Sequence, residues 1–172
     1  QVPHLEMPLD VGGRVSAFTP VGYLPAILAG VDPEALLRGV RHAFENTEFT
    51  KQMIALSLQS FERKERITSF WFYSSRLDKF GLWLEQLWSE SLGKAVTRDN
   101  RPAPFVSSPQ ICCGTTDQHS LLQQLTEGPR DTWAVLFRFA DAEEQMKPLK
   151  KLHLQTELPL QGLTLGHVMS LE

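Results

Sequence analysis

The amino-acid sequence lacks several features that would assign a function directly. Its only two cysteines, Cys112 and Cys113, are neighbours in the chain. Adjacent cysteines form only a strained disulfide, and two thiols are too few for a zinc site. The sequence has no apolar run approaching the roughly 20 residues of a membrane span, and no signal-peptide pattern at its N-terminus. These absences predict reduced thiols and a cytoplasmic protein without a metal site.

An excess of charge of one sign is also missing. The net charge of the 172 residues is −3, so there is no electrostatic reason to expect nucleic acid or an anionic membrane as a partner. The nucleophile elbow, the Walker loop and the GxGxxG dinucleotide motif are absent as well. The composition, 42% apolar and 22% charged, is ordinary for a soluble globular protein, and the length predicts a single domain over residues 1–172.

Helical and strand-like segments alternate along the chain. Apolar residues at helical spacing, together with helix-start signals such as Asp32 before Pro33, predict five helices beginning near residues 20, 33, 47, 76 and 115. Two β-branched and aromatic runs, residues 67–73 and 132–139, predict buried strands, and a proline-rich loop is expected over 95–109. The alternation predicts an α/β fold: a three-layer sandwich whose mostly parallel sheet is flanked by helices.

The run from Gln86 to Lys94 combines an amide, a carboxylate and a glycine break. Gln86 and Glu90 are four residues apart and therefore share a helix face, and Gly93 is a natural stop for that helix. A carboxylate at such a helix end can project into a cleft and act as a general base. The plainer alternative is that Glu90 is simply exposed to solvent and that Lys94 only complements the helix dipole.

Two further segments carry candidate functional side chains. Thr115 and Gln118 form a capping box that predicts a helix start with His119 in its first turn, where the helix dipole favours a neutral imidazole. Arg14 follows two consecutive glycines, where a ligand could approach the backbone and a guanidinium could stabilise an anion. The plainer alternatives are a structural histidine at a helix start and a turn that carries a surface charge.

Taken together, these runs resemble one family. Asp10–Gly22, Gln86–Lys94 and Gly114–Ser120 are similar, in the same order, to three signatures of the phosphoglucose isomerase family, specifically of its second sugar-isomerase (SIS) domain. The likeness extends from about residue 10 to about residue 139. The combination of three signatures is specific, and it favours the functional interpretation of each run over the plainer one. The resemblance implies a flavodoxin-like SIS fold.

The resemblance also implies a reaction and a role for each candidate residue. The reaction is aldose–ketose isomerisation of glucose 6-phosphate and fructose 6-phosphate, without a metal or another cofactor. By position, Glu90 would move a proton between C2 and C1, and Arg14 would stabilise the cis-enediol(ate) intermediate. His119 would help to open the sugar ring, and Gln86 would hydrogen-bond the sugar. In this family the histidine comes from the neighbouring subunit, so a homodimer is expected.

Parts of the family pattern are changed or missing. Val15 stands where the signature usually has an aromatic residue. The phosphate-binding loop of the family lies in its first SIS domain, and its C-terminal lysine lies beyond residue 172. We therefore expect a fragment of a longer enzyme that needs its N-terminal SIS domain and turns over little sugar phosphate alone. The alternatives are a non-catalytic phosphosugar-binding SIS module, or the isomerase part of a fusion with another sugar-phosphate enzyme such as a transaldolase.

Overall fold

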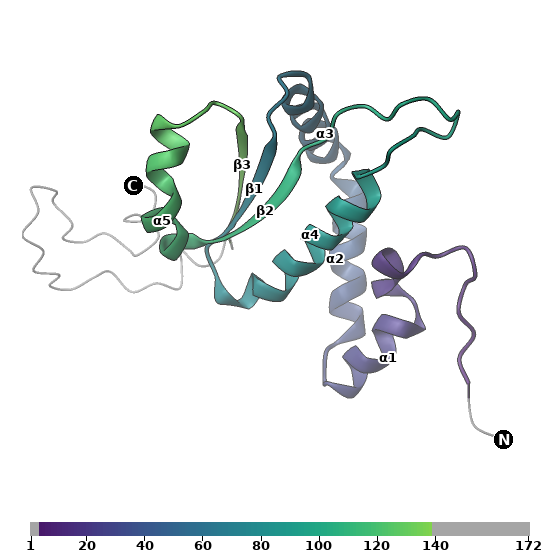
Figure 1. Cartoon of the computed structure of the whole chain (residues 1–172). Helices are drawn as coiled ribbons and strands as arrows, with labels where there is room; N and C mark the ends of the chain where they lie inside the picture. The colour runs from purple at the N-terminus through teal and green to yellow at the C-terminus, as the bar shows by residue number, and fades with distance from the viewer. Residues whose placement is uncertain (1–3, 139–172) are drawn as a thin grey trace, which may run out of the picture. The chain divides into compact units, whose positions relative to one another are not determined.

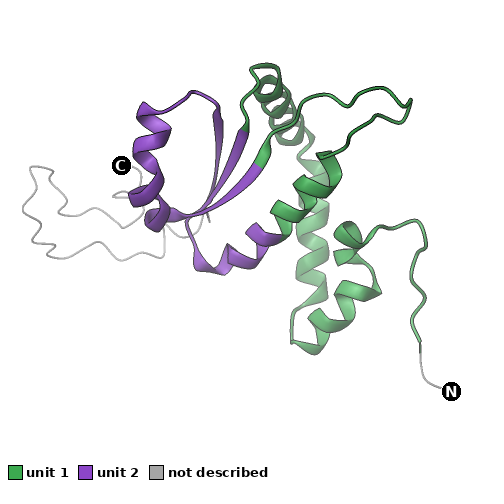
Figure 2. Ribbon diagram, in the orientation of Figure 1, with its two compact units in different colours: residues 1–66, 83–108 green, residues 67–82, 109–172 purple. Residues whose placement is uncertain are grey.

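Two compact units make up the computed structural model, which describes residues 4–138. Unit 1 comprises Gln1–Arg66 and Trp83–Ser108, and unit 2 comprises Ile67–Leu82 and Pro109–Glu172 (Figure 2). Each unit is described by itself below. The last residue of the strand expected over 132–139 lies outside the described residues.

The centre of unit 2 is a three-stranded parallel sheet flanked by helices (Figure 1). The strands are β1 (Ile67–Phe72), β2 (Ser108–Cys113) and β3 (Thr132–Phe137), and their order is β2-β1-β3. β1 pairs in parallel with β3, from Ile67 opposite Thr132 to Phe72 opposite Phe137. Because β1 lies between two other strands, it supplies most of the buried residues: Thr68, Ser69, Phe70, Trp71 and Phe72.

Aromatic rings and a glycine join the sheet of unit 2 to the first turn of α4 (Asp78–Leu92). Phe72 stacks on Phe137 with ring centroids 4.7 Å apart, and Phe80 of α4 meets both rings edge-on at 6.0 Å. Gly81 allows the close approach, because a Cβ there would lie 2.9 Å from Ile111 Cγ2 and 3.0 Å from the Phe72 ring. A side chain at this position would separate helix and sheet.

Unit 1 is helical. Its elements are the 3-10 helix η1 (Gly13–Phe18), α1 (Pro20–Leu28), α2 (Pro33–Glu45), α3 (Thr47–Glu62) and the part of α4 from Trp83 onward. Asp32 caps α2, its Oδ1 accepting a hydrogen bond from the Glu34 N–H at 2.9 Å, as its position before a proline predicted. Trp88 fixes α4 within this unit, since its ring meets Phe61 edge-on at 5.9 Å and its Nε1 donates to the Ser107 carbonyl at 3.1 Å.

The sequence predicted most of these elements but missed one strand. The α/β class, the parallel sheet with flanking helices and the strand at residues 67–73 are confirmed. The helix expected from residue 76 begins with a short 3-10 turn, η2 (Ser75–Leu77). β2 was missed, and it starts at Ser108, inside the predicted loop. Pro109 cannot donate to a strand ladder, so the segment resembles a turn, yet an edge strand tolerates proline.

Candidate active site

Arg14 lies in the 3-10 helix η1, and side-chain hydrogen bonds hold the backbone of this helix in place. Ser16 Oγ donates a hydrogen bond to the Gly13 carbonyl at 2.6 Å, and Ser16 itself is only 6% exposed. Thr19 Oγ1 in turn donates to the Ser16 carbonyl at 2.7 Å, where η1 ends and α1 begins. Arg14 therefore projects from a segment whose backbone is fixed by side chains of the same segment.

One face of α4 and the residue just beyond it present a row of polar side chains around Glu90. Trp83, Gln86, Glu90 and Lys94 follow the spacing i, i+3, i+7 and i+11, which places them along a single helix face. Lys94 lies just beyond the helix, and its Nζ donates to the backbone carbonyl of Glu90 at 2.6 Å. Lys94 thus satisfies one of the last carbonyls of α4, which agrees with its plainer interpretation as a helix-end cation.

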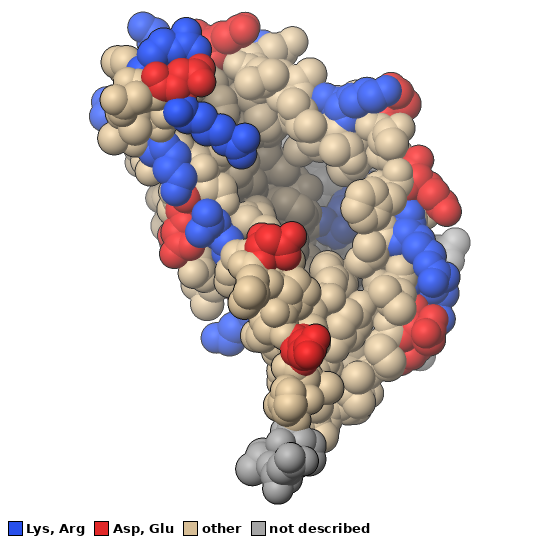
Figure 3. Space-filling model, turned by 90° about the vertical axis from the view of Figure 1, so that its right-hand side faces the viewer, with Lys and Arg blue, Asp and Glu red and all other residues tan. Residues whose placement is uncertain are grey.

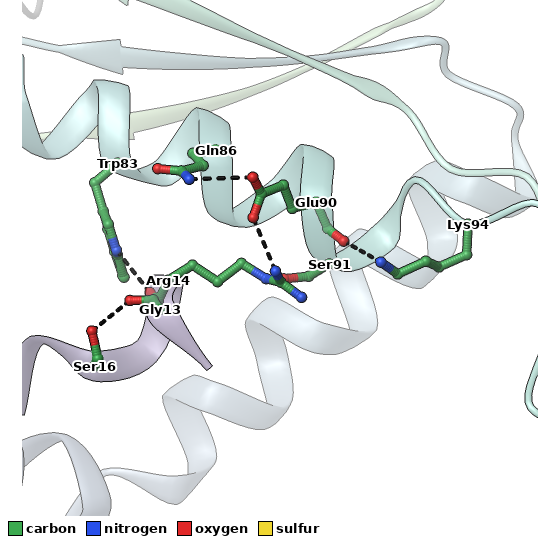
Figure 4. A network of polar contacts seen from close by, with 8 residues as sticks. All are labelled: Gly13, Arg14, Ser16, Trp83, Gln86, Glu90, Ser91 and Lys94. Atoms are coloured by element: carbon green, nitrogen blue, oxygen red, sulfur yellow. Dashed lines mark hydrogen bonds and ion pairs between the residues drawn. The ribbon is translucent and has the colours of Figure 1, made fainter. Parts of the chain in front are cut away.

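Arg14 and Glu90 form an ion pair at the centre of this face (Figure 4). Arg14 Nη1 donates to Glu90 Oε2 at 2.9 Å, and Gln86 Nε2 donates to Glu90 Oε1 at 3.2 Å, so each carboxylate oxygen accepts one hydrogen bond. Arg14 Nε donates to Ser91 Oγ at 3.0 Å. The prediction that Gln86 and Glu90 share a helix face is confirmed by their hydrogen bond, and the structure brings Arg14 to Glu90.

These contacts keep Glu90 in its ionised form. The hydrogen bond from Gln86, then that from Arg14, lowers the pKa of the Glu90 carboxyl below its usual value of 4.5, and the positive charges of Arg14 and Lys94 act in the same direction. Both kinds of interaction favour the charged form of an acid. At neutral pH the group is therefore a carboxylate that can accept a proton.

The site is open to solvent beside the two glycines. The side chains of Arg14 and Glu90 are 34% and 49% exposed. A Cβ placed on Gly12 or Gly13 would meet nothing within 4 Å, and Gly12 has an ordinary φ of −68°. Neither packing against the described residues nor backbone conformation requires these glycines. The expectation that they let a ligand approach the backbone stays a prediction.

His119 lies elsewhere in the chain, on α5 (Gly114–Glu127) of unit 2. Its side chain is exposed, but it is the sixth residue of the helix, so the predicted position in the first turn is wrong. The predicted capping box is wrong as well. α5 starts at Gly114, and it is Asp117 Oδ2 that accepts the N–H of the N-cap residue Cys113, at 2.6 Å. That His119 reaches the site from a neighbouring subunit stays a prediction.

Two polar contacts of the site were missed from the sequence. Ser91 binds the guanidinium, and Trp83 Nε1 donates to the backbone carbonyl of Arg14 at 3.0 Å. Trp83 is 36% exposed, in contrast to the buried Trp71 at 4%. The helical spacing of Trp83 with Gln86 and Glu90 was the available signal, because it places the indole on the same face.

The described part of the chain contains neither a candidate metal site nor a membrane-spanning helix. Residues 4–138 contain no group of three or more His, Cys, Asp or Glu side chains that could hold a metal ion. None of the helices in that range is long and apolar enough to cross a membrane. The face drawn in Figure 3 intersperses basic and acidic side chains, in keeping with a net charge of only −3.

The chain is similar to known isomerases. It is 40% identical over 134 residues to a glucose-6-phosphate isomerase of Rubrobacter xylanophilus, which covers 74% of this chain and 29% of that protein. It is 39% identical over 129 residues to a glucose-6-phosphate isomerase of Thermus thermophilus, covering 73% of this chain and 30% of that protein. The chain thus spans less than a third of the length of these two relatives.

A solved structure and a family description agree with these relatives. The crystal structure of a hypothetical protein from Thermus thermophilus matches with a TM-score of 0.69 and 34% identity, over 95% of this chain and 40% of that one. The family description "Phosphoglucose isomerase" matches residues 4–159, which include Arg14, Glu90 and His119. The chain therefore belongs to the phosphoglucose isomerase family.

Proposed function

We propose that this chain is the part of a glucose-6-phosphate isomerase that carries its proton-transferring base, Glu90. One observation carries the proposal: an ionised carboxylate lies 2.9 Å from a guanidinium, on a surface that is open to solvent. A general base and a cation that stabilises an oxyanion are the two groups that an enediolate mechanism requires. The relatives named above carry the same activity in their names.

In the proposed reaction, each of the two groups has one role. With the sugar ring open, the Glu90 carboxylate takes the proton from C2, and the electrons of that C–H bond form the C1–C2 double bond. The negative charge then rests on the C1 oxygen, where Arg14 stabilises it. Glu90 returns its proton to C1, the hydroxyl proton of C2 passes to the C1 oxygen, and a carbonyl forms at C2. Gln86 orients the carboxylate and hydrogen-bonds the sugar.

The complete site needs groups that this chain does not supply. In the proposed enzyme, an N-terminal SIS domain binds the phosphate, and His119 of a second subunit opens the sugar ring. Because His119 comes from a second subunit, the proposed enzyme is a homodimer. We also propose that it is cytoplasmic and that residues 1–172 belong to its second SIS domain. We expect the 172-residue chain alone to turn over little or no sugar phosphate, and substantial turnover by a pure sample would contradict this.

The decisive experiment measures isomerisation of fructose 6-phosphate by the full-length protein, as wild type and as Glu90→Gln. Loss of a general base lowers kcat by about 10²-fold or more. Glu85→Gln is the matched control, because Glu85 is an exposed residue of the same helix and makes the same change of charge. The control enzyme should keep wild-type activity. Equal activity of the wild type and the Glu90 variant would contradict the role of Glu90.

A binding assay and a transaldolase assay on the same full-length protein separate the remaining alternatives. A folded, dimeric wild-type protein that binds fructose 6-phosphate without converting it would be a phosphosugar-binding module. A protein that isomerises fructose 6-phosphate and also catalyses transaldol transfer would be a fusion with a transaldolase. In the fusion, Glu90→Gln should abolish the isomerase reaction alone.

A further inference from the structure

Arg14 is attached to α4 at two separate points, one on its backbone and one on its side chain. At its root, the Arg14 carbonyl accepts a hydrogen bond from Trp83 Nε1 at 3.0 Å. At its tip, Arg14 Nε donates to Ser91 Oγ at 3.0 Å, next to the ion pair with Glu90. Trp83 and Ser91 are eight residues apart, which is roughly 12 Å or two turns along a helix. Figure 4 shows the arginine side chain extended beside α4 between these two residues.

We propose that Ser91 and Trp83 are positioning residues, which together hold Arg14 in the place where it stabilises the enediolate. This inference rests on the proposed function. Neither residue needs to touch the sugar, because each acts through Arg14. Trp83 fixes the backbone from which the side chain starts, and Ser91 fixes the guanidinium so that its Nη1 faces Glu90.

The second anchor matters because, in the proposed mechanism, Arg14 changes its partner. Its Nη1 donates to Glu90 Oε2 in the structure, and the substrate displaces this contact so that the guanidinium faces the enediolate oxygen. A partly exposed arginine released in this way would sample many rotamers. Ser91 keeps the guanidinium on the helix after Glu90 turns to the substrate. A group held in advance at the developing charge needs no reorganisation when the charge forms.

The first test uses the 172-residue chain and needs no enzymatic activity. The pKa of the Glu90 carboxyl is followed by NMR in the wild type, Ser91→Ala and Ser89→Ala. Loosening Arg14 weakens its contact with Glu90, so Ser91→Ala should raise that pKa toward its usual value. Ser89 is an exposed serine of the same helix, and Ser89→Ala should leave the pKa unchanged. An unchanged pKa in Ser91→Ala would overturn the role of Ser91.

The second test measures kinetics of the full-length enzyme. Because misplacing a catalytic group by about 1 Å can cost 10²-fold, Ser91→Ala should lower kcat by about 10- to 100-fold with a smaller change in KM. Ser91→Thr keeps a hydroxyl and should restore most of kcat. An equal loss of kcat in Ser91→Ala and Ser91→Thr would contradict positioning through the hydroxyl.

Trp83 is tested in the same assay by Trp83→Phe, which keeps an aromatic ring but removes the N–H. The matched control is Trp88→Phe, which loses a similar bond, to the Ser107 carbonyl, but keeps an aromatic ring against Phe61 to hold α4. Only Trp83→Phe should lower kcat and raise the pKa of Glu90; equal effects of the two variants would overturn the role of Trp83. If the NMR shifts appear while the wild-type enzyme lacks isomerase activity, the proposed function fails and the anchoring of Arg14 stands.

Discussion

Arg14 donates a hydrogen bond to Glu90 at 2.9 Å although the two residues are 76 positions apart in the chain. The pair joins a short 3-10 turn to a long helix, and it leaves both charged groups partly exposed. The carboxylate of Glu90 and the guanidinium of Arg14 are therefore bound to each other in the structure. Because solvent screens the attraction between two such exposed charges, the ion pair is weak. A substrate that forms its own hydrogen bonds with Arg14 and Glu90 can therefore separate them.

The pKa of Glu90 should respond to each of its two partners. Gln86→Leu removes the hydrogen bond that lowers this pKa most, and Arg14→Gln removes the next contributor together with its charge. Both substitutions should raise the carboxyl pKa toward 4.5. NMR titration of the glutamate side-chain carbons in the 172-residue chain measures the shift.

The same pKa fixes the direction of one pH effect on stability. Because folding lowers the pKa of Glu90, the contacts of the carboxylate stabilise the folded state above the unfolded-state pKa near 4.5. This stabilisation is lost as the pH falls through the lower, folded-state value. Glu90→Gln should therefore weaken the loss of unfolding free energy that the wild type shows as the pH falls through the acidic range. If the free energy of unfolding falls equally with acidic pH in the wild type and in Glu90→Gln, the lowered pKa of Glu90 is contradicted.

The two adjacent cysteines should differ sharply in reactivity. Cys112 is 0% exposed, and burial, followed by the negative charge of Asp117, raises the pKa of its thiol from 9.0 to about 11. Cys113 is exposed, and both thiols are free. Since the thiolate is the reactive form, iodoacetamide at pH 8 should modify Cys113 first, and Cys112 only after unfolding.

Peptide mapping of the labelled chain distinguishes the two sites. Cys113→Ala should remove the fast labelling, and Cys112→Ala should leave it intact. Fast modification of Cys112 in the folded wild type would contradict its burial. The raised pKa also implies that stability falls between about pH 9 and pH 11, because there the unfolded chain releases a proton that the folded chain retains.

Local signals predicted helix positions well where side chain and backbone partners are close in sequence. Asp32 caps α2 as expected, because its partner N–H is two residues away. The start of α5 was misjudged because Thr115 and Gln118 match a capping pattern, while the residue that bonds the N-cap N–H is Asp117. Spacing alone does not decide between competing acceptors one or two residues apart.

Contacts between distant segments could not be predicted by spacing. That Gln86 and Glu90 share a helix face follows from their separation of four, but nothing local indicates that Arg14 reaches the same face. Only the resemblance to a family joined the two motifs. Ser91 belongs to the Gln86–Lys94 signature and Trp83 lies outside it, but neither contact with Arg14 could be predicted, since both depend on where the η1 backbone lies. β2 was missed for a similar reason, because its partner strand β1 is far away in sequence. In addition, Pro109 makes the start of β2 resemble a turn.

The cap of α5 should contribute measurably to stability. Asp117→Ala removes the acceptor of the Cys113 N–H and should lower the free energy of unfolding by about 1 kcal/mol. Asp117→Asn keeps an acceptor and should cost less. Urea unfolding followed by circular dichroism gives both values. Equal losses in the two variants would show that the charge of Asp117, and not its hydrogen bond, stabilises the helix start.

Alanine substitution should have opposite effects at two helical glycines. At Gly81, the new Cβ would lie 2.9 Å from Ile111 Cγ2 and 3.0 Å from the ring of Phe72. Helix or sheet must then move, so Gly81→Ala should destabilise the chain by about 1–3 kcal/mol despite the better helix propensity of alanine. At Gly39, inside α2, a Cβ would meet nothing within 4 Å, so Gly39→Ala should stabilise by up to about 1 kcal/mol. Urea denaturation of both variants measures the difference, and stabilisation by Gly81→Ala would contradict the close packing of α4 on the sheet.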